Sequence, residues 1–214
     1  KGTFGRLVGF AGSLCYNGAA YMCASSALRS GVGLYFAASP VSAVKIIAAG
    51  LHEAVYVPLP ETPDGFVDVD SAALEEIVLP KLDKASAVIV GCGLGNSENT
   101  RRLTEFVIRR AACPVIIDAD GINSIAGNID VLKERTGDTI LTPHPLEFSR
   151  MTGLSIAQIQ SDRLIAAKGF AQEYGVTLLL KGADTVIAAP DGRACVNSRA
   201  CSGLSKGGSG DVLT

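Results

Sequence analysis

The chain has 214 residues, of which 48% are hydrophobic, and this is enough to bury a sizeable core in a single domain. Its formal net charge of -2 excludes the strong basic field that attracts nucleic acid. It shows no apolar run of about 18 residues and no signal or transit peptide, so we expect a cytoplasmic protein without a membrane partner. The six cysteines show no CxxC spacing, which favours a reduced protein over a disulfide framework or a zinc site.

The N-terminal part of the sequence alternates apolar strands with helical stretches. Strands are predicted at residues 6–11, 32–37 and 54–59, and helices at 18–30, from Pro40 onward and at 70–79. A Gly-Ser pair follows the first strand, and a Gly-Ala-Ala run opens the next helix. Because ligands of α/β sheets bind beyond the carboxyl ends of strands, these small side chains would permit close approach of a ligand.

The middle of the sequence places two further motifs after predicted strands. Strand 87–90 is followed by Gly-Cys-Gly-Leu-Gly at 91–95 and by a helix at 99–111. A glycine turn of this kind can approach a ligand, although a purely structural turn is equally common. Strand 115–118 leads into Asp-Ala-Asp-Gly-Ile-Asn at 118–123. For one of these two carboxylates or the amide we favour helix capping.

The segment Thr-Pro-His-Pro-Leu-Glu at 142–147 follows a predicted strand at 139–142. Its two prolines fix the backbone around His144, so we expect this histidine to bind a polar ligand. Glu147 lies at the start of the next helix. There it suits a hydrated magnesium ion and a favourable interaction with the helix dipole equally well. The other histidine, His52, has no comparable setting and is expected at the surface.

A helix at 161–174 precedes three predicted strands at 178–181, 185–189 and 194–197. These strands lack intervening helices, so they could add an antiparallel edge to the sheet. Lys181 ends the first of them and is followed by Gly182. A lysine in this position can reach a phosphate as a point charge. The alternative is an exposed lysine in a structural hairpin.

The last motif is a glycine-rich turn, Gly-Gly-Ser-Gly-Asp, at 207–211. Glycines let backbone amides come close to a phosphate, and a helix that starts here would add its positive dipole end. Asp211 at the edge of this turn can take a proton from an attacking hydroxyl. Phosphoryl transfer requires at least an anion-binding turn and a base beside it. A flexible tail is the alternative.

Apolar strands separated by helices predict an α/β/α sandwich with a central, mainly parallel sheet. No linker divides the sequence, so we expect one domain over residues 1–214. The last predicted helix is just beginning at Thr214, and Lys1 stands immediately before a strand. We therefore expect a domain that is truncated at its C-terminus and cut from a longer polypeptide.

In series, these motifs resemble the ADP/ATP-dependent NAD(P)H-hydrate dehydratase family, a branch of the ribokinase-like fold. The matching segments cover nearly the whole chain and are GSLCYNGAAYMCASSALRSGVGL, VIVGCGLG, IIDADGIN, ILTPHPLEFSRMTG, LLLKGADTVIAAPDG and KGGSGDVLT. TPHPxE, KGAxT and GGxGD in this order are highly specific. The resemblance implies a ribokinase-like three-layer sandwich and a lyase that repairs the S epimer of hydrated NADH or NADPH. ADP or ATP would be the co-substrate and Mg²⁺ the cofactor.

The resemblance also implies a mechanism and residue roles. The nucleotide's terminal phosphate is first transferred to the ring hydroxyl, and elimination of phosphate then restores the double bond. Asp211 would be the catalytic base and would contact the hydrated dinucleotide, and Gly208, Ser209 and Gly210 would form the anion hole. The other implied positions are Ala19, Gly93 and His144 for the hydrated dinucleotide, Lys181, Gly182, Ala183, Asp184, Thr185 and Gly210 for the nucleotide, and Glu147 for Mg²⁺ through water.

Two other functions remain open at this point. A ribokinase-like kinase of a small alcohol, such as a hydroxymethylpyrimidine, needs the same first step, although TPHPxE and KGAxT favour the dehydratase. A non-catalytic nucleotide-binding domain is the alternative from another class. By resemblance we expect a homo-oligomer, such as a tetramer, and an epimerase that is either fused to this chain or separate from it.

Overall fold

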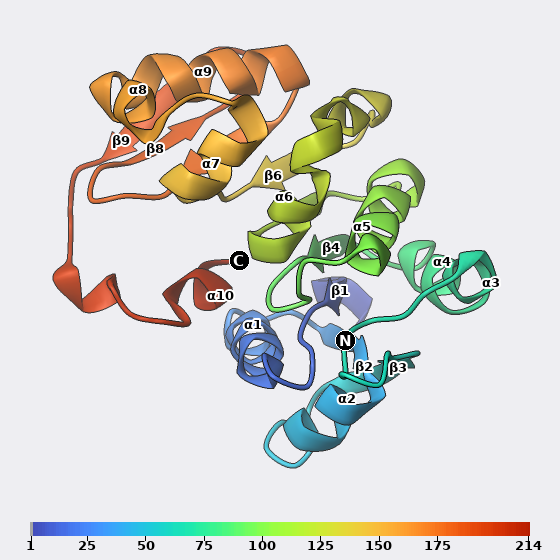
Figure 1. The fold of residues 1–214 in the computed structure, drawn as a ribbon. Helices are drawn as coiled ribbons and strands as arrows, with labels where there is room; N and C mark the ends of the chain where they lie inside the picture. The colour runs from blue at the N-terminus through green and yellow to red at the C-terminus, as the bar shows by residue number, and fades with distance from the viewer. Residues whose placement is uncertain (1) are drawn as a thin grey trace.

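The computed structural model describes residues 2–214, and a single sheet of nine strands runs through it (Figure 1). The strands lie in the order β3-β2-β1-β4-β5-β6-β7-β8-β9. Neighbours from β3 to β7 are parallel, and β8 and β9 pair antiparallel at one edge. The strand bounds are β1 Arg6–Phe10, β2 Leu34–Pro40, β3 Val55–Leu59, β4 Ala87–Val90, β5 Val115–Ile117, β6 Thr139–Leu141, β7 Thr177–Leu180, β8 Thr185–Ala188 and β9 Ala194–Asn197.

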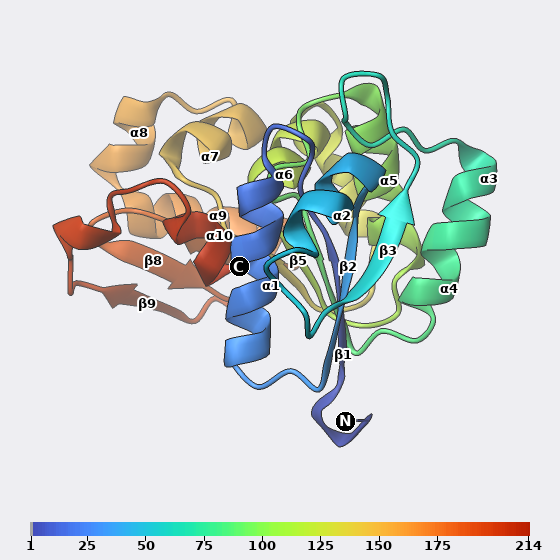
Figure 2. The same ribbon diagram turned by 90° about the horizontal axis from the view of Figure 1, so that it is seen from below.

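Helices cover both faces of this sheet (Figure 2). They are α1 Asn17–Arg29, α2 Val41–Ile47, α3 Ser71–Ala73, α4 Leu79–Leu82, α5 Glu98–Arg110, α6 Ala119–Ile125, α7 Pro145–Thr152, α8 Ile156–Ser161, α9 Arg163–Tyr174 and α10 Ser209–Leu213. Short helical turns at Gly2–Phe4, Leu74–Val78, Ala126–Glu134 and Ser202–Leu204 complete the set. No helix within residues 2–214 has the length and apolar character needed to cross a membrane.

The central strands β1, β2, β4 and β5 are covered on both faces, which explains their almost continuous apolar sequences. Successive side chains of a strand point to opposite faces, so each of these four strands contributes to two separate cores. Val8 and Phe10 of β1 belong to the larger core, which lies under α5, α6 and α9. Tyr35 and Ala37 of β2 belong to the smaller core under α1 and α2. The predicted α/β sandwich with a mainly parallel sheet and an antiparallel edge is thus confirmed.

In two helical regions the structure differs from the prediction. The helix predicted at 161–174 is interrupted at Asp162, whose side chain accepts a hydrogen bond from the amide of Ile165 (2.9 Å) and so starts α9 separately from α8. Helix α6 and the helical turn that follows it were not predicted at all. The sequence of α6, Ala-Asp-Gly-Ile-Asn-Ser-Ile, is rich in weak helix formers, so tertiary packing rather than propensity forms it.

The sheet topology creates one crevice at the carboxyl ends of its strands. β1 and β4 are neighbours, but the chain leaves them in opposite directions, toward β2 and toward β5. The connecting helices α1 and α5 therefore pack on opposite faces and leave space between the loops that follow β1 and β4. This topological switch point is where an α/β sheet is expected to bind its ligand.

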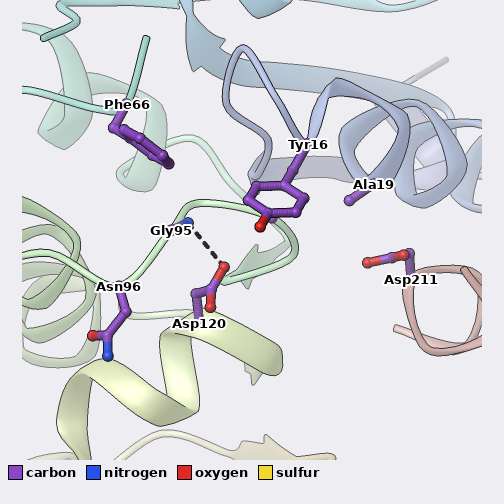
Figure 3. A pocket seen from close by; sticks show the side chains of 8 residues that line it. Tyr16, Ala19, Phe66, Gly95, Asn96, Asp120 and Asp211 are labelled. Carbon is purple, nitrogen blue, oxygen red and sulfur yellow. Dashed lines mark hydrogen bonds between the residues drawn. The ribbon is translucent and has the colours of Figure 1, made fainter. Parts of the chain in front are cut away.

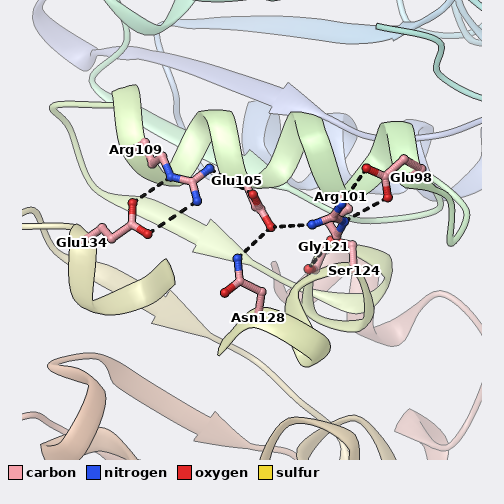
Figure 4. Close-up of polar contacts among 8 residues, drawn as sticks. All are labelled: Glu98, Arg101, Glu105, Arg109, Gly121, Ser124, Asn128 and Glu134. Atoms are coloured by element: carbon pink, nitrogen blue, oxygen red, sulfur yellow. Dashed lines mark hydrogen bonds and ion pairs between the residues drawn. The ribbon is translucent and has the colours of Figure 1, made fainter. Parts of the chain in front are cut away.

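A chain of charged side chains fastens α5 to the segment that follows α6 (Figure 4). Its centre is Glu105, whose side chain is 12% exposed. This carboxylate accepts hydrogen bonds from Arg109 (2.9 Å), Arg101 (3.3 Å) and Asn128 (3.0 Å). Burial alone would raise the pKa of Glu105, but the hydrogen bonds from Asn128 and Arg109 outweigh it and hold the pKa below its usual value.

We predict that Glu105→Gln lowers the free energy of unfolding at neutral pH by about 1–3 kcal/mol, because a charged acceptor of several hydrogen bonds is lost. The depressed pKa means that this stabilisation is complete above the unfolded-state value and disappears as the pH falls through the folded-state value. Urea unfolding midpoints of the wild type and the variant should therefore converge in acid. The control is Glu98→Gln, an exposed partner of Arg101, which should change stability little. A constant difference at all pH values would contradict the assignment.

Candidate active site

A pocket of about 520 Å³ lies at the switch point of the sheet (Figure 3). The residues that line it are Tyr16, Ala19, Phe66, Gly93, Gly95, Asn96, Asp120 and Asp211. Three of them, Ala19, Gly93 and Asp211, are positions to which the family resemblance assigns a role. They come from α1, the loop after β4 and α10, and the fold brings them into one cavity.

Gly93 brings the loop after β4 directly against the start of α1. Its φ angle is +67°, and a Cβ atom at this position would lie 2.8 Å from Cβ of Tyr16 and 2.9 Å from Cβ of Ala19. Real Cβ atoms do not approach other atoms this closely, so only glycine fits here. The backbone of the loop is therefore exposed to the pocket, where it can contact a ligand without an intervening side chain.

Asp211 faces the same pocket from the first turn of α10, which packs on α1. Its pKa is raised above the usual value for an aspartic acid, first by partial burial and second by the negative charge of Asp118. A carboxylate with a raised pKa is a stronger base than one in water. The position and the electrostatics of Asp211 are therefore compatible with the role of general base that the family resemblance implies.

A buried ion pair lies beside the glycine-rich turn. Nζ of Lys181, at the end of β7, is 2.8 Å from Oδ1 of Asp118, at the end of β5. The side chain of Asp118 is only 2% exposed, and its second oxygen accepts a hydrogen bond from the hydroxyl of Thr214 (2.8 Å). The Cβ position of Gly210 lies 3.5 Å from Nζ of Lys181. The ammonium group thus stands against the turn that was predicted to form the anion hole.

The predicted helix capping in the Asp-Ala-Asp-Gly-Ile-Asn segment is wrong. Asp118 precedes α6 but its side chain makes no capping hydrogen bond, because both oxygens are engaged by Lys181 and Thr214. Asp120 accepts a hydrogen bond from the amide of Gly95 (2.8 Å), across the pocket floor. Asn123 accepts one from Arg150 (2.7 Å). All three side chains therefore make long-range contacts in place of the local ones that were expected.

His144 and Glu147 form a reciprocal capping box at the start of α7. Nδ1 of His144 accepts from the amides of Leu146 (3.1 Å) and Glu147 (3.2 Å), and the carboxylate of Glu147 accepts from the amide of His144 (2.8 Å). Burial and then the charge of Lys181 lower the pKa of His144, which keeps Nδ1 free to accept. Burial raises the pKa of Glu147. Neither residue lines the pocket, but Glu147 lies 4.0 Å from Nζ of Lys181.

The turn from Lys181 to Thr185 joins β7 to β8 and is held from two sides. The hydroxyl of Thr185 donates to the carbonyl of Gly182 (2.9 Å) and closes the turn. Arg163, which was not identified from the sequence, donates to the carbonyls of Leu180 (2.8 Å) and Lys181 (3.2 Å). Gly182, Ala183 and Asp184 are exposed, so this turn presents its backbone to the solvent near the ion pair.

Three buried hydroxyl groups beside the crevice have no hydrogen-bond partner within residues 2–214. They belong to Ser13, Thr142 and Ser209. Ser13 follows β1, Thr142 follows β6, and Ser209 is the middle residue of the glycine-rich turn. Because buried polar groups are nearly always satisfied, these groups indicate a site that is completed by water or by a polar ligand.

Several residues of this region have roles that no local signal in the sequence indicates. Asp118 and Asp120 were noticed as a motif but were given no role, because nothing local shows that their partners lie on β7 and on the loop after β4. Tyr16 and Phe66 carried no local signal at all. Conversely, His52 is exposed as predicted, and all six cysteines are free.

Comparisons with known proteins agree on one family. The family model for NAD(P)H-hydrate dehydratase matches residues 7–214. The chain is 40% identical to the bifunctional NAD(P)H-hydrate repair enzyme of Moorella thermoacetica over its whole length, and it covers 40% of that protein. It is 36% identical to the ADP-dependent (S)-NAD(P)H-hydrate dehydratase of Bacillus subtilis and covers 71% of it. The chain thus spans about two fifths of the length of the bifunctional relative.

Solved structures give the same result. The crystal structure of the ADP/ATP-dependent NAD(P)H-hydrate dehydratase from Bacillus subtilis, co-crystallised with ATP and Mg²⁺, matches with a TM-score of 0.79 and 33% identity, over 99% of this chain and 70% of that one. A ribokinase-like superfamily protein from Enterococcus faecalis matches with a TM-score of 0.79 at 24% identity, over 98% and 68%, and supports the ribokinase-like fold alone. With the family model covering nearly every residue, the chain belongs to the NAD(P)H-hydrate dehydratase family.

Proposed function

We propose that this protein dehydrates the S epimer of hydrated NADH or NADPH with ADP or ATP as co-substrate. The main observation behind the proposal is that Ala19, Gly93 and Asp211 line the same pocket. The glycine-rich turn and the Lys181–Asp118 pair stand at its border. The relatives named for this reaction share the whole length of the chain.

The chemistry assigns one role to each part of the site. Hydroxide is a poor leaving group, so the ring hydroxyl must first be converted to a phosphate ester. Asp211 takes the hydroxyl proton while the oxygen attacks the terminal phosphorus of the nucleotide and the bond to the nucleotide breaks. The amides of Gly208, Ser209 and Gly210 stabilise the charge on the transferred group. Loss of phosphate from the ring, together with loss of a proton from the adjacent ring carbon to water, then restores the double bond.

The nucleotide would lie along the turn from Lys181 to Thr185. Lys181 supplies a cation at the glycine-rich turn, and the exposed backbone of Gly182, Ala183 and Asp184 is free to contact the AMP portion. The hydroxyl of Ser209, which has no partner in the described chain, fits a phosphate oxygen. His144 would contact the hydrated dinucleotide at the border of its site.

The residues present fit magnesium only as a water-mediated contact. Within residues 2–214, no group of three or more His, Cys, Asp and Glu side chains could hold a metal ion directly. Both oxygens of Glu147 already contact His144. Mg²⁺ commonly keeps several waters and binds through substrate phosphates, and in that mode Glu147 could orient a bound water. When bound, the ion would neutralise charge on the phosphates.

The rival functions are separated by one experiment. Incubation with hydrated NADH and ADP or ATP should restore the absorbance of the reduced nicotinamide only when the nucleotide is present. A small alcohol such as a hydroxymethylpyrimidine that accumulates as its phosphate, without recovery of NADH, would support the kinase. Nucleotide binding without turnover of either substrate would support the non-catalytic domain. The matched control is the same incubation with AMP, which has no terminal phosphoanhydride to transfer.

Several features that the family resemblance implies stay predictions. They are a homo-oligomer such as a tetramer, a cytoplasmic location, a single domain over residues 1–214, and an epimerase on the same or another polypeptide. The bifunctional repair enzyme of Moorella thermoacetica, of which this chain covers 40%, is compatible with a second activity beside the dehydratase. Light scattering that shows a strict monomer would contradict the first.

We predict that Asp211→Asn lowers kcat about 10²–10⁴-fold, because the side chain keeps its shape but can no longer accept a proton. Nucleotide affinity should be preserved, since Lys181 and the glycine turn are unchanged. Single-turnover kinetics and nucleotide titration measure the two effects separately. Asp191→Asn, in the exposed turn after β8, is the control for the loss of one carboxylate. Near-normal turnover of Asp211→Asn would give the carboxylate a structural role and exclude this mechanism.

We predict that Lys181→Ala raises the KM for the nucleotide by about 10- to 100-fold, because a hydrogen bond to a charged phosphate is lost. The substitution also leaves Asp118 buried without its cation, which destabilises the fold. The double variant Lys181→Ala/Asp118→Asn removes both charges and should recover stability in urea unfolding while the KM stays high. If the KM recovers together with stability, Lys181 acts only on the fold.

The acid limb of the pH profile provides a further test. Asp211 must be ionised to act as a base, and its pKa is raised, so kcat/KM should fall as the pH drops through a value above that of an ordinary aspartic acid. Asp118→Asn removes a negative charge that contributes to the raised pKa of Asp211. The limb should therefore move to lower pH in this variant. A shift to higher pH would contradict the assignment of the base.

A further inference from the structure

The pocket contains a carboxylate that the proposed reaction does not use. Asp120 lines the cavity together with Ala19, Gly93 and Asp211 (Figure 3). Its Oδ2 accepts a hydrogen bond from the amide of Gly95, 2.8 Å away. Within residues 2–214 this is its only hydrogen bond, and no cation forms an ion pair with it. Oδ1 therefore remains available to one donor from a ligand.

The backbone between Asp118 and Asp120 has an unfavourable conformation, and the two carboxylates lie in different surroundings. Ala119, between them, has a φ angle of +49° and is the only residue other than glycine with a positive φ within residues 2–214. Close packing enforces this conformation, since a Cβ atom on Gly91 would lie 1.8 Å from the carbonyl oxygen of Asp118. One carboxylate consequently meets Lys181 and the other faces the pocket. Backbone strain maintained in this way is a feature of functional sites.

Two aromatic rings complete the surroundings of Asp120. Tyr16 is 56% exposed and lies over the pocket on the side of Asp211, and Phe66 lies on the other side of Gly95 (Figure 3). The ring of Phe66 packs on the backbone of Gly95, whose Cβ position is 2.5 Å from Cδ1 of the ring. The loops that carry the two rings are joined by a hydrogen bond from the amide of Leu14 to the carbonyl of Gly65 (2.9 Å).

These surroundings suit a flat ring that carries a hydrogen-bond donor at its edge. Aromatic side chains contact the face of a ring, and a carboxylate without a cation accepts strongly from an amino group. In the proposed reaction, Asp211 acts on a hydroxyl of the nicotinamide ring, so the other substituents of this ring must lie in the same pocket. The carboxamide is the ring substituent that carries an amino group.

We propose that Asp120 accepts a hydrogen bond from the carboxamide amino group of the substrate's nicotinamide ring and thereby makes the site specific for a pyridine carboxamide. This inference rests on the proposed function. A site built to bind an amino group rejects an analogue that lacks it, because the carboxylate is then left without its partner. Asp120 determines specificity and does not take part in proton transfer.

The test compares two dinucleotides that differ at one group. NADH carries the carboxamide, and the reduced 3-acetylpyridine analogue carries a methyl ketone with the same ribose and phosphate groups. Calorimetric titration of the wild type should show binding of NADH about 10- to 100-fold tighter than binding of the analogue. In Asp120→Asn the side-chain oxygen stays with the amide of Gly95 and an amino group faces the pocket, so this ratio should fall to about one.

The control is Asp64→Asn, which removes the same charge from an exposed position on the loop of Phe66 and should leave the ratio unchanged. Circular dichroism and urea unfolding verify that Asp120→Asn is folded. An unchanged ratio in Asp120→Asn would overturn the inference, and so would an equal loss of affinity for both dinucleotides, which would place the contact on the ribose. If the wild type turns over hydrated NADH in either case, the proposed function stands. A wild type that neither binds NADH nor turns over its hydrate would overturn both.

Discussion

The buried contact between Lys181 and Asp118 is the interaction on which the rest of the site depends. It joins the carboxyl end of β7 to that of β5, with β6 between them, and Thr214 attaches α10 to the same carboxylate. Removal of one partner from a buried ion pair typically costs about 3–5 kcal/mol, because the remaining charge is left in a medium of low polarity. The ammonium group, the glycine-rich turn and the parallel strands are therefore fixed relative to one another.

The site consists of two neighbouring groups of residues. One group, around Lys181, is charged and connected through Glu147 to the capping box of α7. The other is the pocket at the switch point, which is formed by aromatic rings, backbone and two carboxylates. Asp211 belongs to the pocket but its pKa responds to Asp118, so it connects the two. This arrangement suits a reaction in which a phosphoryl group passes from one ligand to another.

The sheet could be predicted from the sequence because its central strands are buried on both faces and are therefore apolar almost throughout. Helix α6 could not, since its residues favour turns and its stability comes from packing against α5 and α7. Nothing local in the sequence shows that Nδ1 of the histidine in the TPHPxE motif caps α7, and the ligand-binding role of this histidine stays a prediction. Asp120 and Phe66 were missed because their importance arises from Gly95, which is distant from both in the sequence.

The contact between α1 and α10 has a consequence for how the protein folds. Tyr16 and Asp211 line one pocket although nearly the whole chain separates them, and even Asp118 and Thr214 are 96 residues apart. Contacts of such long range form late, because the entropy of closing the loop must be overcome first. The pocket therefore forms after the strands of the sheet have paired, because it needs residues of α1 and of α10 at the same time.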